Sequence, residues 1–349
     1  MSRQLKGSLC LAACIGLFAT TQISRADEKV LYVGGSGGSI EKAFREKIIP
    51  PFEKKFNLKV EYVTGNSTDL LAKLQAQKAN QQLDAVFVDD GPMYRAINLG
   101  FCKPLDAAPV YSDLYDLAKF PSNQAVMIAI LGAGLMYNAD YFKKRNWAVP
   151  TSWNDLKDTK YKQLILIPPL NNTYGLVALV AEARASGGSE KSIDPGFQAF
   201  KNGIGPNVLA YEPSPGKMTE LFQSGAAVFA VWGSSRAKAL QDTGFPVNFV
   251  YPKEGGYAIG IAMCPVAGAK DKPEAQEFIR HVLDPESQIA LALAAALGPV
   301  NKKAELTAEQ RVGIPYGEDQ FKQLKALDWA TINDNRDEWN RRWTREIER

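Results

Sequence analysis

Polar and aromatic side chains cluster where predicted strands end and helices begin. Trp232, Ser234 and Arg236 follow the apolar run 226–231, and Tyr257 opens a later apolar run. In open α/β sheets, ligands bind at the carboxyl ends of strands and next to helix N-termini. An indole in this position predicts a small-molecule cleft with Trp232 at its centre.

Two adjacent acids, Asp89 and Asp90, follow a second predicted strand and precede a helix. One carboxylate can accept a hydrogen bond from a ligand ammonium group while the other caps the helix. We expect one acid in each role. Arg236 in the first turn of its helix opposes the helix dipole, and an anionic ligand group would offset that cost. The alternatives are a solvated arginine or one paired to a protein carboxylate.

Two polar loops add further candidates, and both stand between a strand and a helix. The loop 34–39 lacks the Gly-Lys-Ser/Thr of a P-loop, and Ile40 stands where a dinucleotide fingerprint needs glycine. Backbone N–H groups at a helix start suit a polar ligand group, although a plain connector is the alternative. The loop 168–175 offers side-chain amides and hydroxyls. The candidate ligand contacts in the two loops are Gly35, Ser36, Asn172 and Thr173.

Residues that typically carry catalysis are scarce, so we expect no catalytic residue, cofactor or metal site. The only histidine, His281, lies in a predicted amphipathic helix without a neighbouring cysteine or acid motif, and no Gly-x-Ser-x-Gly elbow occurs. Cys102 is the one nucleophile worth naming, and it lacks an evident base. Cys102 and Cys264 could pair, but we expect two buried single thiols because a fold of this size needs no bridge.

The N-terminal residues 1–26 have the pattern of a secretory signal. A basic start precedes an apolar run that is too short for a membrane span, and a small-x-small site ends at Ala26. A lipoprotein box ending at Cys14 is the less favoured alternative. The formal charge is +3, and removal of this segment, with three basic residues and no acid, brings it to zero. A neutral surface argues against a nucleic-acid partner.

Apolar strand patterns alternate with helical ones throughout, which indicates an α/β fold. The run 126–137 is apolar at nearly every position, as a strand buried on both faces is. A capped helix is predicted over 150–161, and a C-terminal helix over 335–347. Trp339 and Trp343 lie four residues apart in that last helix, a spacing typical of a core stripe.

Three longer motifs carry a resemblance. Residues 78–106 end in Gly-Phe-x-x-Pro-Leu-Asp, 150–162 read Pro-x-Ser-Trp-x-Asp-Leu-x-Asp-x-x-Tyr-Lys, and 272–288 read Lys-Pro-Glu-Ala-x-x-Phe-Ile-x-x-x-Leu-x-Pro-Glu-x-Gln. The chain resembles periplasmic solute-binding proteins of ABC transporters, most closely the spermidine/putrescine-binding branch. The resemblance implies a type II fold with two α/β lobes, each a mixed sheet flanked by helices. It also implies a periplasmic monomer that delivers a solute to permease subunits in the inner membrane.

The same resemblance implies lobe limits. Lobe 1 would comprise 27–131 with 261–304, and lobe 2 would comprise 132–260 with 305–349. The chain would cross between the lobes near 129–135 and 257–262, and a hinge there would close the lobes around the ligand.

The polyamine site itself is only partly matched. Trp232 corresponds to the family's aromatic residue, but the stretch 258–261 lacks the central acid, the loop 170–174 has no carboxylate, and Gly35-Ser36 replaces Trp-Thr. An unpaired buried ammonium costs several kcal/mol, more than the roughly 0.5–2 kcal/mol from stacking on an indole.

We therefore expect a small polar solute, either an amino-acid-like zwitterion or a short amine or polyamine. A small organic acid or phosphonate is the alternative. A thiaminase-like enzyme on the same scaffold, with Cys102 as nucleophile, is the rival of a different class. Iron is not expected, because adjacent tyrosines are absent.

Overall fold

The computed structural model describes residues 29–270 and 272–348. The predicted signal segment and Cys14 lie outside these residues. Within them, the strands form one mixed sheet in the order β2-β1-β3-β9-β4-β7-β5-β6, with β8 paired to β4. The strands are β1 Val30–Gly35, β2 Lys59–Thr64, β3 Ala85–Asp89, β4 Val126–Asn138, β5 Ile165–Ile167, β6 Val208–Tyr211, β7 Phe229–Gly233, β8 Val247–Val250 and β9 Tyr257–Pro265.

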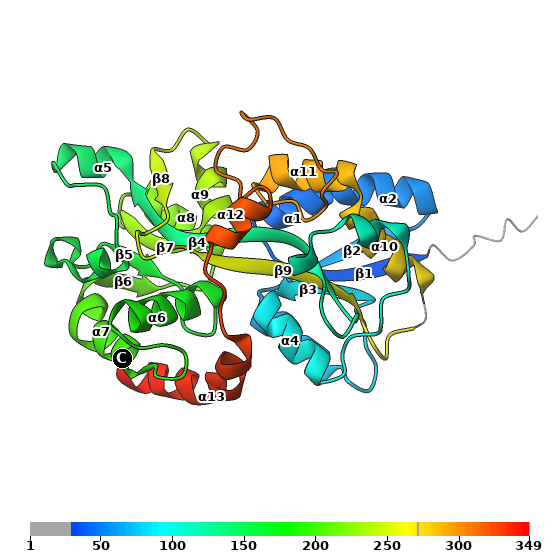
Figure 1. Cartoon of the computed structure of the whole chain (residues 1–349), viewed down its shortest axis with the longest axis horizontal. Helices are drawn as coiled ribbons and strands as arrows, with labels where there is room; N and C mark the ends of the chain where they lie inside the picture. Colours follow the sequence, from blue (N-terminus) through cyan, green and yellow to red (C-terminus); the bar gives the residue numbers. More distant parts are fainter. Residues whose placement is uncertain (1–28, 271, 349) are drawn as a thin grey trace, which may run out of the picture.

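The molecule has two halves that share this sheet (Figure 1). Parallel strands β1, β2 and β3 form one end of the sheet, and parallel β5, β6 and β7 form the other. The two long central strands β4 and β9 pair antiparallel and join the halves. We call the part with β1 to β3 the first half and the part with β5 to β8 the second half. The lobe limits given above stay a prediction.

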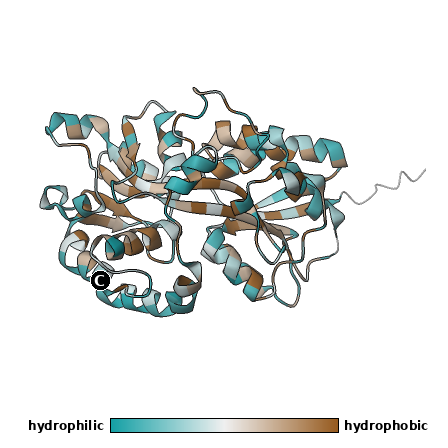
Figure 2. Ribbon diagram, viewed as in Figure 1, coloured by the Kyte–Doolittle hydropathy of each residue, from teal (hydrophilic) through white to brown (hydrophobic). Residues whose placement is uncertain are grey.

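Helices cover the sheet, and Figure 2 shows apolar strands behind helices with polar outer faces. None of the helices in the described part of the chain is long and apolar enough to span a membrane. The helices are α1 Ser39–Ala43, α2 Ile49–Phe56, α3 Ser67–Ala76, α4 Asp90–Asn98, α5 Ala139–Lys144, α6 Thr173–Ala185, α7 Asp194–Ala199, α8 Pro215–Gln223, α9 Ser234–Gln241, α10 Pro273–Leu283, α11 Pro285–Ala295, α12 Glu318–Gln323 and α13 Trp329–Glu346.

Apolar burial explains why the strands form where the sequence predicts them. Strand β4 is buried at every position but one, and most of its residues belong to one hydrophobic cluster that extends from Phe44 in the first half to Trp343 in the second. Burying a large apolar side chain contributes about 1.5–3 kcal/mol. Because the cluster runs through β4 and β9, the junction between the halves is part of the core.

The helix boundaries differ from expectation in two informative places. Residues 150–161 form two short 3₁₀ turns, Trp153–Lys157 and Thr159–Tyr161, although the predicted capping box at Ser152 is present. Helix α13 begins six residues earlier than predicted, at Trp329. The Asp328 carboxylate accepts from the Thr331 N–H at 3.1 Å and caps it. This extra turn brings the start of α13 to the boundary between the two halves.

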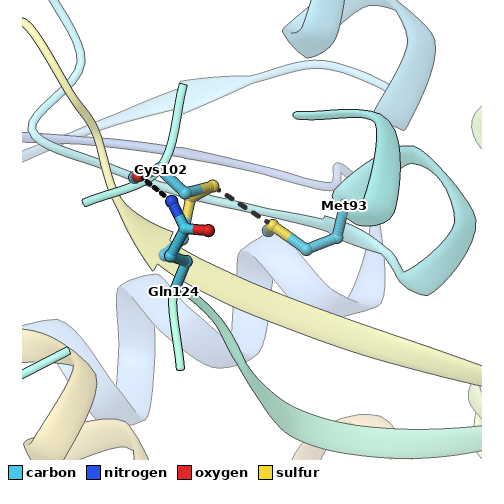
Figure 3. The surroundings of a disulfide bond; sticks show 4 residues. Met93, Cys102 and Gln124 are labelled. Atoms are coloured by element: carbon cyan, nitrogen blue, oxygen red, sulfur yellow. Dashed lines mark hydrogen bonds between the residues drawn. A yellow bond between two sulfur atoms is a disulfide. The ribbon is translucent and has the colours of Figure 1, made fainter. Parts of the chain in front are cut away.

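Cys102 and Cys264 form a disulfide, so the prediction of two single thiols is wrong (Figure 3). Residue 102 forms an isolated bridge with Val266, directly after β9, and this pairing brings the two sulfur atoms together. Cys102 is 3% exposed, with its sulfur 3.6 Å from that of Met93. A buried disulfide sulfur offers no thiolate, which removes the basis for Cys102 as a nucleophile.

The disulfide yields a stability prediction. It joins residues 162 positions apart, and a crosslink across a long loop stabilises a fold by about 2–5 kcal/mol. We expect the double variant Cys102→Ala/Cys264→Ala to lose that much unfolding free energy in urea titrations. Dithiothreitol should destabilise the parent protein and leave the double variant unchanged. Equal stability of the two proteins would contradict this role.

Candidate functional site

A cavity of about 370 Å³ lies between the two halves. The first half contributes the β1–α1 loop, the β2–α3 loop and the end of β3, through Ser36, Gly37, residues 64–69 and Asp89. The second half contributes Trp232, Arg236 and the loops that precede α6 and α8. Leu131 of β4 and Ile261 of β9 belong to the lining where the halves join. Carboxyl ends of parallel strands therefore face one another across this cavity, as the sequence predicts.

Several helices begin at this cavity. Asn66 caps α3 by accepting from the Asp69 N–H at 2.9 Å, and Asn172 caps α6 by accepting from the Tyr174 N–H at 2.9 Å. Ser214 caps α8, whereas α9 follows Gly233 and has no side-chain cap. The N-terminus of a helix carries a partial positive charge and unpaired N–H groups. Their convergence favours a negatively charged group in the cavity.

Hydrogen bonds connect the two halves directly across the cavity. Thr173 Oγ1 donates to the Asp89 carboxylate, and Thr68 Oγ1 donates to the Asn171 carbonyl at 2.7 Å. Arg236 Nη1 donates to the Gly37 carbonyl at 2.9 Å and to Ser39 Oγ at 3.3 Å. These contacts hold the halves in a closed arrangement.

Gly38 makes the arginine contact possible. Its φ is 72°, and a Cβ at this position would lie only 2.4 Å from Arg236 Nη1. Arginine carries five N–H donors in a fixed fork, and two of them point to Gly37 and Ser39. Because Arg236 lines the cavity, its guanidinium adds positive charge to the lining.

Of the two adjacent carboxylates, Asp89 is the one that lines the cavity, as expected for one of them. Burial raises the pKa of Asp89, while hydrogen bonds with Thr173 and Ser67 and the charges of Arg336 and Arg236 lower it. The protein itself therefore provides the Asp89 carboxylate with hydrogen-bond donors and nearby positive charges.

Asp90 turns away from the cavity, so its prediction as a ligand contact is not supported. Its carboxylate accepts from the Gly91 N–H at 3.0 Å and hydrogen bonds with Trp329. Helix α4 has no side-chain cap, so the prediction that one of the two acids caps it is wrong. Burial raises the pKa of Asp90 to about 7. A carboxyl group in an enclosed, largely apolar position is less stable in its charged form.

Trp232 lines the cavity at its second-half wall and is 5% exposed. Its ring stacks beside that of Tyr174, with centroids 6.2 Å apart and planes at 10°. The indole Nε1 is buried and has no hydrogen-bond partner among the described residues. A buried N–H donor without a partner is costly, and an acceptor in the cavity would satisfy it.

Ser36, Asn172, Thr173 and Arg236 also line the cavity, whereas three further predicted contacts do not. Gly35 packs against Phe87, where a Cβ would lie 2.2 Å from the ring. Ser234 Oγ accepts from the Gly132 N–H at 3.2 Å and faces a second cavity. Tyr257 is 1% exposed and packs between Trp153 and the Arg184 guanidinium. Ser36 lines the cavity next to Gly35, and Trp232 and Arg236 line it on either side of Ser234, whereas on β9 the lining residue is Ile261.

Besides the loop before α8, which contributes Pro213, Ser214 and Pro215, two elements of the site were not predicted. The β2–α3 loop around Asn66 contributes several lining residues, and its polar run after an apolar strand is the same signal that identified the other loops. The second element is Arg336 of α13, which donates from Nη2 to the Asn171 carbonyl at 3.0 Å. Nothing in the local sequence connects residue 336 to a cleft loop more than 160 positions earlier.

The family of bacterial extracellular solute-binding proteins matches residues 47–313. The chain belongs to this family. The spermidine/putrescine-binding periplasmic protein of Escherichia coli K12 is 24% identical over 260 residues, which cover 72% of each chain.

Solved structures show the same fold. The periplasmic binding protein AfuA of Actinobacillus pleuropneumoniae, with fructose-6-phosphate bound, gives a TM-score of 0.77 at 22% identity and covers 93% of this chain and 99% of its own. AgtB of A. tumefaciens R10, in complex with agropinic acid, gives 0.74 at 22% identity, with 92% and 99% covered. The predicted periplasmic-binding-protein fold is thereby confirmed.

The buried state of Asp90 generates a pH prediction for this solute-binding protein. The folded protein holds the Asp90 proton more tightly than the unfolded chain, because the pKa rises from 3.8 to about 7. The resulting stabilisation is complete below about pH 4 and is lost as the pH rises towards 7. We therefore expect the stability of the parent protein relative to Asp90→Asn to fall across pH 4–7. Urea unfolding at four pH values measures it, and a difference that does not change with pH would contradict it.

A second prediction concerns closure without solute. Thr173→Val removes the hydroxyl that donates to Asp89 across the cavity, leaving a buried carboxylate short of one donor. We expect the closed arrangement to lose population. Spin labels at Gln75→Cys on α3 and Gln223→Cys on α8, two exposed positions, should report longer distances.

Thr219→Val is the matched control for this experiment. The Thr219 hydroxyl donates to the Pro215 carbonyl within α8 and does not cross the cavity. The control should leave the distance distribution unchanged. Identical distributions for the parent and Thr173→Val would show that the Thr173–Asp89 contact does not hold the halves together.

Proposed function

We propose that this protein is the extracytoplasmic solute-binding component of an ABC importer. It would capture a small solute carrying a carboxylate or phosphoryl group between its two halves and deliver it to the permease. The residues 1–26 would direct its export to the periplasm, and the crossing segments predicted above would form the hinge. Membership of the extracellular solute-binding family and the cleft between the halves support this proposal.

The observation that carries the solute class is the place of Arg236 in the cavity lining. It stands in the first turn of α9, which has no side-chain cap, and the nearby Trp232, also in the lining, has a buried indole N–H without a hydrogen-bond partner among the described residues. All three favour a negatively charged oxygen acceptor. Asp89, the buried carboxylate of the lining, already accepts from Thr173.

The same arrangement disfavours a long polyamine. Each ammonium group of such a ligand needs a counter-charge when it leaves water. In the cavity lining, Asp89 is occupied by protein donors and Asp69 is exposed at the start of α3. The E. coli relative is named for spermidine and putrescine, whereas AfuA was solved with fructose-6-phosphate and AgtB with agropinic acid. The shared fold thus accommodates anionic solutes as well as polyamines.

An amino-acid-like zwitterion is the second candidate, and the presence of Asp89 in the cavity lining favours it. Its carboxylate would lie at Arg236 and its ammonium group at Asp89. This arrangement requires that the ligand replace Thr173 as the partner of Asp89.

A ligand panel distinguishes the candidates. We expect malate, citrate, glucose 6-phosphate or 2-aminoethylphosphonate to raise the melting temperature, since a ligand that binds the folded state stabilises it. Glutamate and glutamine test the zwitterion, and putrescine and spermidine test the amine. Calorimetry then gives the affinity, and chromatography should recover the ligand unchanged. Binding of amines alone, or conversion of the ligand, would refute the proposal.

Arg236→Met tests the anion contact directly. A hydrogen bond to a charged group contributes about 1.5–3 kcal/mol, so we expect at least about tenfold weaker binding of the anion found in the panel. The matched control is Arg341→Met, which removes an exposed arginine of α13 outside the cavity lining. Unchanged affinity in Arg236→Met would exclude Arg236 as the anion contact.

A further inference from the structure

Arg336 is a buried cation outside the cavity lining, so contact with a solute does not account for its position. It lies on α13, is 6% exposed, and donates to a backbone carbonyl, that of Asn171. A buried guanidinium is costly unless charges of opposite sign compensate it. Its place in the fold therefore requires a negative partner nearby.

The position of α13 explains how this cation reaches the cleft. Trp343 anchors the helix in the second half. Its ring centroid lies 4.7 Å from that of Phe200 and 5.3 Å from that of Tyr211. The other end reaches the first half, where Asn333 Nδ2 donates to the Gly91 carbonyl at 3.3 Å. Figure 1 shows α13 starting near α4 and running below α6 towards the C-terminus. Arg336 lies between these two anchors.

The charge that compensates Arg336 is that of Asp89. Burial lowers the pKa of Arg336 to about 10, and Asp89 is the charge that most opposes this change. Reciprocally, the charge of Arg336 lowers the pKa of Asp89 more than the charge of Arg236 does. Arg95 and Asp337 also act on Arg336, but they pair with each other at 3.4 Å and Asp337 is exposed.

A chain of contacts links the two groups through the cleft loop. Arg336 binds the carbonyl of Asn171, and two residues later Thr173 donates to Asp89. Asn171, Thr173 and Asp89 all line the cavity, whereas Arg336 does not. The cation thus acts from behind the cavity wall, where a solute cannot displace it.

We propose that Arg336 determines the charge preference of the cleft by neutralising Asp89 from behind. This inference rests on the proposed function. With Arg336 in place, the positive charge of Arg236 and the helix N-termini are left for an anionic solute. Without it, the charge of Asp89 is offset only by Arg236, so the carboxylate favours an ammonium group and draws the positive charge of Arg236 away from an anion. Asp69 also lines the cavity but is exposed to solvent, which screens its charge.

Two substitutions separate the charge of Arg336 from its hydrogen bond. Arg336→Gln removes the charge and keeps an N–H donor for the Asn171 carbonyl, while Arg336→Lys keeps the charge. The affinities of glucose 6-phosphate, malate and putrescine are measured by calorimetry for each protein. In Arg336→Gln the ratio of anion to putrescine affinity should fall about tenfold or more, because a nearby opposite charge has effects of that size. Arg336→Lys should retain the ratio, and Arg341→Met is the control.

A second measurement requires no solute. Carbon-13 NMR of aspartate-labelled protein follows the Asp89 carboxyl during a pH titration, with Asp89→Asn assigning the signal. The pKa of Asp89 should rise in Arg336→Gln and stay unchanged in Arg341→Met. If Arg336→Gln does not fold, the double variant Asp89→Asn/Arg336→Gln removes both charges. That variant should fold and keep the anion preference.

The outcomes distinguish the two proposals. A parent protein that prefers putrescine refutes the proposed anionic solute. The Asp89 titration in Arg336→Gln then tests separately whether Arg336 offsets the charge of Asp89. A parent protein that prefers anions, with an unchanged ratio and an unchanged Asp89 titration in Arg336→Gln, overturns the role of Arg336 and leaves the proposed function standing. Loss of the anion preference in the double variant would also overturn it.

Discussion

The Asp89 carboxylate, buried at the boundary between the two halves, is the constraint on which the closed cleft depends. A buried carboxylate must be given donors or positive charge, and no single segment supplies them. Ser67 comes from the first half, Thr173 from the second, and Arg336 from the C-terminal helix. Closure therefore brings together the donors and charges that surround Asp89. The electrostatics of the site thus depend on the arrangement of the halves.

The sheet explains how such a site coexists with a stable core. Strands β4 and β9 are buried along nearly their whole length, and the main hydrophobic cluster continues through them from one half to the other. The polar contacts between Arg236 and Gly37, and between Thr68 and Asn171, lie instead at the loops. Apolar packing holds the halves together at the strands, while a few hydrogen bonds of modest net energy close them at the loops.

Local pattern predicted most of the strands and most of the loops that form the cleft, because each combines an apolar run with polar residues at its end. It failed at Tyr257 because that ring packs against Trp153 and Arg184 away from the cavity, and at Ser234 for a geometric reason. Side chains alternate across a strand and rotate by about 100° per residue in a helix, so neighbours of a lining residue face elsewhere. Ser234 thus binds the Gly132 N–H, while Trp232 and Arg236 line the cavity. The disulfide was missed because the pairing of residues 102 and 264 arises only from the register of the sheet.

Arg336 belongs to a kind of residue that no local pattern identifies. Sequence places it in an amphipathic helix whose tryptophans fill the core, and its charge there would be assigned to solvent. Only the return of the chain to the boundary between the halves brings it behind Asn171. On the proposed role of Arg336, a scaffold whose relatives include a spermidine/putrescine-binding protein would change the charge of its preferred solute through a residue outside the cavity lining. A comparison of lining residues alone would overlook such a change, because Arg336 does not line the cavity and would act by offsetting the charge of Asp89, which does.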